Sequence, residues 1–402
     1  MQRHARLGAT ALGLMASFYL VGCGDTSPSA GDAGASDGGA TVPADGALPE
    51  RFNTPMTPAF GSMTNDPRAI LVTVSGEAAA TEGFAYSATP AEGDLVFVDG
   101  WQVNMTRVLT VIGNVRLNRL GNMPSDPSVV GAAVAADPRS FAVNLTRPGP
   151  IEGAGGEGSA WPLVAFRNGV NGLTLDPAQR YAFSYDVIAA TAAAENVNLD
   201  ADDVALYRTM ITRGWSVYAE GTATYRGQAP EATSAFASFP TTVRWQVAYG
   251  APAAYLNCNN PDNGAEGAPG VQPSANGAYR AQITFHLEHW FWGALQVEDP
   301  PLHFDPFAAR AAVTGAQGEV TLDALQGVVP SNLQDRMMRP LGDRGGQTRG
   351  YTVRNPAALS FDTGGVSSVR DLRDFVAFSG RANAHLNGEG LCFVRPMGEL
   401  RF

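Results

Sequence analysis

Short runs of β-branched and aromatic residues, separated by turn-forming dipeptides, constrain the fold of this 402-residue chain more than any other feature. Such runs favour pleated strands, and dipeptides such as Asn168-Gly169, Asn263-Gly264 and Asn276-Gly277 are typical of tight turns. The predicted strands are 69–74, 95–98, 101–120 with a break near Gly113, 141–145, 161–166, 181–188, 215–225, 241–249 and 279–292. We therefore expect a mainly β fold, an antiparallel sandwich or barrel-like body with a few helices.

Helix signals are few and lie late in the chain. Asp200 is a typical N-cap for a helix over 201–213, and Gly214 follows as a typical C-terminal glycine. Further helices are predicted over 306–313, 322–325 and 368–378. We expect a β-rich body over residues 61–300 and a mixed α/β C-terminal region over residues 301–402, packed on that body.

The N-terminal residues form a targeting segment. Arg3 and Arg6 make a basic start, and the apolar run from Leu7 to Val21 is too short to span a bilayer comfortably. The segment closes on Leu20-Val21-Gly22-Cys23, which resembles the lipobox of bacterial lipoproteins. That resemblance implies removal of residues 1–22, acylation of Cys23 and anchoring to a membrane through the lipid. A plain signal peptide is the alternative.

Residues 24–60 are rich in Gly, Ala, Ser, Asp and Pro and predict a flexible tether. Leader, tether and β-rich domain together resemble the uncharacterised surface lipoproteins of myxobacteria. In many lipoproteins an aspartate after the acylated cysteine marks retention in the inner membrane, but here Gly24 follows Cys23. We therefore expect the protein to be anchored in the outer membrane, at its periplasmic face or on the cell surface. The net charge of −11 argues against a nucleic-acid partner.

Beyond Cys23 the chain contains only Cys258 and Cys392. In an oxidising compartment outside the cytoplasm, these residues are expected to form a disulfide. Two free thiols, or a metal site with two cysteines, are the other interpretations.

The stretch 281–305 contains three of the five histidines, and we expect a functional site of this protein to include residues of this stretch. If the strand over 279–292 continues to its end, His286 and Glu288 lie on its more polar face, and His289 lies on the apolar face as a buried, hydrogen-bonded residue. His303 precedes a helix that Asp305 is expected to cap.

Imidazole and carboxylate groups are ligands that zinc and copper accept, so His286, Glu288 and His303 predict a metal site. His385 or Asp305 is a candidate further ligand, since a disulfide at Cys392 would draw His385 toward the middle of the domain. Three suitable side chains that are close in sequence need not converge in space, which is the alternative. In a helix, His286 and His289 would share a face, but the spacing matches no metalloprotease signature.

Three functional hypotheses follow. The first is a lipid-anchored extracytoplasmic binding protein for zinc or copper. The second is a non-catalytic surface module that binds an envelope protein or a glycan through exposed aromatic residues, Trp290 and Trp292. The third is a metal-assisted hydrolase in which Glu288 or Asp305 acts as the base. Since the chain contains no recognisable nucleophile motif, a non-enzymatic role is favoured.

Overall fold

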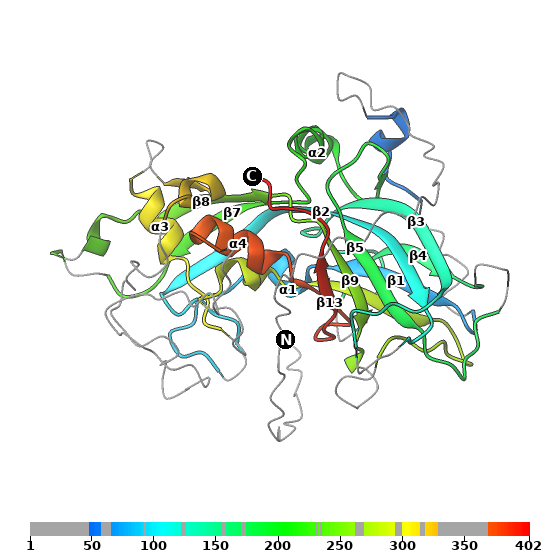
Figure 1. The fold of residues 1–402 in the computed structure, drawn as a ribbon. Coiled ribbons are helices and arrows are strands. Elements are labelled where there is room, and N and C mark those ends of the chain that lie inside the picture. The colour runs from blue at the N-terminus through cyan, green and yellow to red at the C-terminus, as the bar shows by residue number, and fades with distance from the viewer. Residues whose placement is uncertain are drawn as a thin grey trace, which may run out of the picture. The chain divides into compact units, whose positions relative to one another are not determined.

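The structure is a computed structural model (Figure 1) that describes residues 48–57, 66–91, 94–121, 126–154, 158–169, 172, 174–229, 232–233, 235–261, 269–293, 300–313, 318–328 and 369–402. The chain divides into two compact units, Met1–Ala40 and Thr41–Phe402, and every described residue belongs to the second. The leader with Cys23, and most of the expected tether, lie outside the described residues. None of the helices in the described part of the chain has the length and apolarity that crossing a membrane requires.

Two mixed sheets make up the body, as expected for a mainly β, sandwich-like fold. The smaller sheet has the order β12-β10-β1-β4, and the larger has the order β11-β8-β7-β2-β5-β9-β13, with β3 paired to β2 and β6 paired to β3. The strands are β1 (Ile70–Ser75), β2 (Trp101–Asn118), β3 (Ala133–Asn144), β4 (Trp161–Phe166), β5 (Ala182–Val187), β6 (Glu195–Asn196), β7 (Val217–Tyr225), β8 (Thr242–Tyr249), β9 (Ala253–Cys258), β10 (Tyr279–Phe285), β11 (Glu319–Thr321), β12 (Ala384–Leu386) and β13 (Phe393–Pro396). Most pairs are antiparallel, but β1 pairs in parallel with β10, β3 with β6 and β8 with β11.

The core follows from the alternation of side chains along the strands. Ile70 and Val72 of β1 join a large cluster to which both sheets contribute, whereas Leu71 joins a small cluster on the opposite face. The long strand β2 runs without a break, and the irregularity expected near Gly113 is a register shift between Gly113 and Val115.

Four α-helices are described: α1 (Glu77–Thr81), α2 (Ala201–Arg213), α3 (Asp305–Ala311) and α4 (Leu372–Gly380). The 3-10 helices are η1 (Glu50–Asn53), η2 (Ala235–Ser238), η4 (Leu287–Phe291) and η5 (Leu322–Leu325). The predicted bounds of α2 are confirmed, and Tyr207 and Met210 pack it against Leu109 and Val111 of β2. Figure 1 shows α2 over one face of the larger sheet.

Two predicted helix starts are wrong. α4 begins after Asp371, whose side chain accepts the backbone N–H of Asp374. At α3 the N-cap is Phe304, and a carboxylate from a distant segment, Asp99, accepts the N–H groups of Phe304 and Asp305 at 2.7 Å each. Asp305 is therefore the first helical residue and not the cap.

The predicted strand over 279–292 is also wrong in its second half. β10 ends at Phe285, and the chain continues as η4, in which every residue is buried. Ser379 of α4 donates its hydroxyl to the carbonyl of His289 at 2.7 Å, so η4 is held by a helix instead of a neighbouring strand. The predicted strand 95–98 forms only an isolated bridge between Phe97 and Leu302.

The expected disulfide between Cys258 and Cys392 is confirmed. Cys258 ends β9, and Cys392 immediately precedes β13, which pairs with β9 at the edge of the larger sheet. The C-terminal segment is thereby attached to the middle of the body.

Candidate metal centre

The candidate site lies where β1 and β10 end. Ser75 and Thr284 are register partners in this parallel pair. Glu77 and His286 each follow two residues later, so both emerge at the same edge of the smaller sheet. The carboxyl ends of parallel strands are a common location for ligand sites in open sheets.

The other neighbour of β10 brings a second imidazole to this edge. His385 of β12 pairs with Thr284 in the antiparallel register, which makes it the diagonal neighbour of His286 on the same face. The centroids of the two imidazole rings are 4.3 Å apart. Both side chains are buried, with His286 5% and His385 9% exposed.

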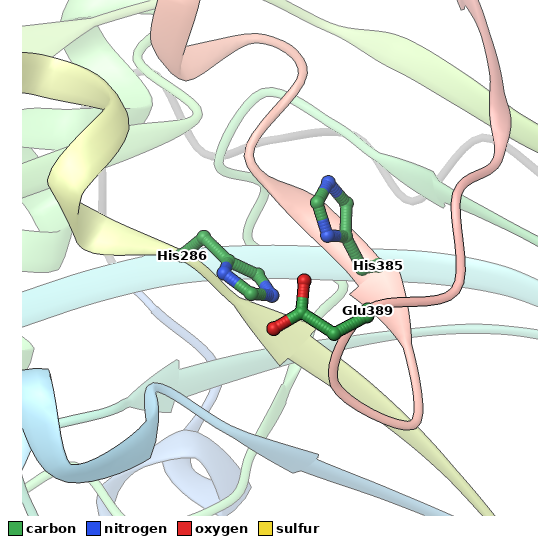
Figure 2. Close-up of side chains that lie close together, drawn as sticks. All are labelled: His286, His385 and Glu389. Carbon is green, nitrogen blue, oxygen red and sulfur yellow. The ribbon is translucent and has the colours of Figure 1, made fainter. Parts of the chain in front are cut away.

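A tight hairpin after β12 adds a carboxylate. Leu386 and Gly390 exchange backbone hydrogen bonds, and Asn387 and Gly388 turn the chain with φ values of 51° and 83°. Asparagine and glycine are the residues that adopt this left-handed conformation most readily. The hairpin carries Glu389, and ligand atoms of His286, His385 and Glu389 all lie within 4.8 Å of one another. Figure 2 shows the exposed Glu389 carboxylate between the two imidazole rings.

Buried polar contacts fix this hairpin on β10. The side-chain oxygen of Asn387 accepts the N–H of Gln282 at 2.8 Å, and the hydroxyl of Thr284 accepts the N–H of Gly388 at 3.1 Å. These buried hydrogen bonds fix the backbone position of Glu389, although its own side chain is exposed to solvent.

His286 donates from both ring nitrogens. Nδ1 lies 3.0 Å from Oε1 of Glu288, and Nε2 lies 2.8 Å from the carbonyl oxygen of Gly388, which can only accept. Burial opposes protonation, but the hydrogen bond and charge of Glu288, the charge of Glu77 and the Gly388 carbonyl together raise the pKa of His286 to about 10. A metal ion bound at Nε2 would displace a proton and the Gly388 contact.

His385 presents a neutral imidazole. Burial and the charge of His286 lower the pKa of His385 to about 3, although the carbonyls of Gly388 and Ala382 act in the opposite direction. Its Nδ1 is buried and makes no hydrogen bond of acceptable geometry with any described residue. A buried polar atom without a partner costs free energy, and a metal ion would remove that cost.

The metal ligands predicted from the sequence do not all lie at one site. Among the described residues, the group with metal-binding geometry contains His286 and His385 but not Glu288, His303 or Asp305. Glu288 is bound to the Nδ1 side of His286. Glu288 is thus placed to orient His286, as carboxylates beside metal-bound histidines do.

His303 and Asp305 belong to the start of α3. Nδ1 of His303 lies 3.7 Å from the Asp99 carboxylate, and the Asp305 carboxylate accepts the indole N–H of Trp101 at 2.8 Å. Both residues are 1% exposed. Their contacts with Asp99 and Trp101 place them in the packing of α3.

The predicted aromatic pair, Trp290 of η4 and Trp292 directly after η4, does not form an exposed platform. Trp290 is 1% exposed and donates its indole N–H to the Tyr249 hydroxyl at 2.8 Å, so its predicted exposure is wrong. Trp292 is half-buried and lies against the ring of His289, with 3.5 Å between the ring centroids. The expectation that His289 is buried and hydrogen-bonded is confirmed, since it is 4% exposed and its Nδ1 lies 3.3 Å from the Ser379 carbonyl.

Sequence reasoning missed Glu389 and Glu77. The Asn387-Gly388 turn signal beside His385 indicates a hairpin that returns the next residue toward the histidine, and it could have identified Glu389. Glu77 carries no local signal, because its position depends on the parallel pairing of β1 with β10.

No protein-family model, no curated protein and no solved structure matches this chain. The function must therefore be argued from the geometry of the site itself.

Proposed function

We propose that the protein is a lipid-anchored extracytoplasmic protein that binds one divalent transition-metal ion, zinc or copper, through His286, His385 and Glu389. The observation that carries the proposal is the convergence of these three ligand groups within 4.8 Å of one another. Two imidazoles and a carboxylate are a common ligand set for such ions.

The surroundings of the three groups support metal binding. Glu288 fixes the ring of His286 through Nδ1, as carboxylates do beside many metal-bound histidines, and a metal would bind at Nε2 in place of the Gly388 carbonyl contact. The buried His385 is neutral, and its Nδ1 makes no hydrogen bond with a described residue.

The anchoring part of the proposal rests on the leader sequence and on Cys23. The disulfide between Cys258 and Cys392 supports a location outside the reducing cytoplasm. We expect the wild-type protein to fractionate with membranes and the Cys23→Ser variant to leave them, as followed by immunoblot. A wild-type protein recovered in the soluble fraction would contradict lipid anchoring.

Metal content tests the binding function directly. The full-length protein is produced in a bacterium with its own leader, purified without a histidine tag, and measured by mass spectrometry. We expect about one equivalent of zinc or copper per chain, lost in His286→Ala, His385→Ala and Glu389→Gln. Glu399→Gln is the matched control, because Glu399 is an exposed carboxylate of the same C-terminal segment.

The His303→Gln variant separates the two ligand sets. The geometry predicts that it keeps its metal, whereas the set His286, Glu288 and His303 requires it to lose the ion. Circular dichroism confirms that each variant is folded. Absence of metal in the wild type, with no uptake on titration, would refute the proposed function.

A further inference from the structure

Glu77 approaches the proposed site from a part of the chain remote from the other ligands. It is the first residue of α1 and directly follows the glycine after β1. Its Oε1 lies 3.7 Å from Nε2 of His286, on the side of the ring away from Nδ1, to which Glu288 is bound. The Glu77 side chain is 19% exposed.

The distance fits two ligands of one ion. Metal–ligand bonds of about 2.0–2.1 Å at a tetrahedral angle place neighbouring ligand atoms about 3.3 Å apart. The 3.7 Å between Glu77 and His286 differs from this by a few tenths of an ångström. Glu77 lies outside the group of His286, His385 and Glu389, whose ligand atoms are all within 4.8 Å of one another, so a bound ion would have to draw its side chain toward the other two ligands.

The backbone of Glu77 is held in an unfavourable conformation. Its φ of 57° lies in the left-handed region, which residues with a Cβ adopt only at a cost in conformational energy. Glycine would avoid this cost. The fold therefore keeps a carboxylate at a position where the backbone alone favours glycine, and this carboxylate faces His286.

Charge at the site also favours a divalent cation. The carboxylates of Glu77, Glu288 and Glu389 gather round the imidazoles of His286 and His385. The only sulfur atoms of cysteine in the second compact unit form the disulfide, so the donor set consists of nitrogen and oxygen. Such donors suit Zn²⁺ and Cu²⁺, whereas Cu⁺ prefers thiolate and thioether.

We propose that Glu77 is a fourth ligand, and that it closes an N₂O₂ site that retains a divalent ion and leaves no coordination position for a substrate. The inference rests on the proposed function, because it requires that His286, His385 and Glu389 bind the metal. A closed shell of four protein ligands is typical of metal sites that hold an ion, whereas catalytic sites keep one position for water. The third functional hypothesis, metal-assisted hydrolysis, requires that open position.

Cobalt provides a direct readout of the coordination shell. The full-length protein is stripped of metal, loaded with Co²⁺, and examined by visible absorption while azide is added. For the wild type we expect the intense absorption of four-coordinate Co²⁺, unchanged by azide. For Glu77→Gln we expect Co²⁺ affinity weaker by roughly tenfold or more, since even the loss of a carboxylate outside the ligand shell costs that much. Azide should then alter the spectrum.

Two further variants keep the test decisive. Glu77→Gly suits the left-handed backbone and is expected to fold, to bind Co²⁺ weakly and to respond to azide. Glu82→Gln, an exposed glutamate just after α1, is the matched control and should behave as the wild type.

The outcomes separate the two proposals. If azide alters the wild-type spectrum as strongly as that of Glu77→Gly, and the affinities agree, Glu77 is not a ligand while metal binding stands. If the wild type binds no Co²⁺, the proposed function fails and the inference fails with it.

Discussion

At the residue scale, Glu288 orients the imidazole of His286 and is not itself one of the proposed metal ligands. Its carboxylate accepts the Nδ1–H of His286 at 3.0 Å and is 6% exposed. A carboxylate in this position orients the imidazole and increases its basicity without touching the metal.

We therefore expect Glu288→Gln to lower metal affinity by about 10–100-fold while the stoichiometry of binding stays at one ion per chain. Competition with a chelator of known affinity measures the first quantity, and metal analysis at saturation measures the second. Glu399→Gln serves as the control. Complete loss of binding at saturating metal would make Glu288 a ligand, as the spacing in the sequence first suggested.

The sequence predicted part of this site for a physical reason. His286 and Glu288 interact because they are two residues apart. His385 was included in the prediction because the expected disulfide would bring it toward the middle of the domain. The strand order of the smaller sheet places Glu77 at the site, and the hairpin after β12 places Glu389 there. Strand order depends on pairings between distant segments, which a single sequence does not specify.

At the element scale, α2 was predicted to the residue because its signals are local. The side chain of Asp200 accepts the N–H groups of Asp202 and Asp203, and the Asp203 carboxylate accepts the N–H of Asp200. Gly214 ends the helix with φ 67°. η4 was missed because its aromatic residues favour a strand, while its actual conformation is set by contacts with α4.

The cap of α2 has a predictable pH dependence. Hydrogen bonds from the Asp203 N–H and from Arg147 hold the pKa of Asp200 below its usual value of 3.8, although burial opposes them. A carboxylate whose pKa is lower in the folded state stabilises the fold above the unfolded-state pKa, and the contribution disappears as the pH falls through the folded-state pKa.

We expect Asp200→Ala to lower the free energy of unfolding by about 0.5–2 kcal/mol at pH 7, and by less at pH 3. Urea denaturation at the two pH values measures both differences. Asp200→Asn is the matched variant, since asparagine caps as well as aspartate but carries no charge, and its cap contribution should not change with pH. Equal stability of Asp200→Ala and wild type at pH 7 would show that the cap contributes nothing.

At the scale of the whole molecule, the disulfide joins segments that lie far apart in the chain. Cys258 and Cys392 are separated by 134 residues, and the bond attaches the last strand of the chain to the edge of the larger sheet. Cys392 also follows Glu389 by three residues, so the bond restrains the segment that carries a proposed ligand.

A closed loop of this length restricts the unfolded chain, and in the chain-entropy model it stabilises the folded state by about 4–5 kcal/mol. We expect the Cys258→Ser/Cys392→Ser double variant to lose about that much free energy of unfolding, as measured by urea denaturation. The wild type unfolded in the presence of a reductant should match the double variant, which makes it the control for the substitution itself. A double variant as stable as the oxidised wild type would mean that the pairings of β9 with β13 and of β10 with β12 hold the C-terminal segment without the covalent bond. The hairpin with Glu389 would then owe its position to these strand pairings and to hydrogen bonds such as those of Asn387 and Thr284.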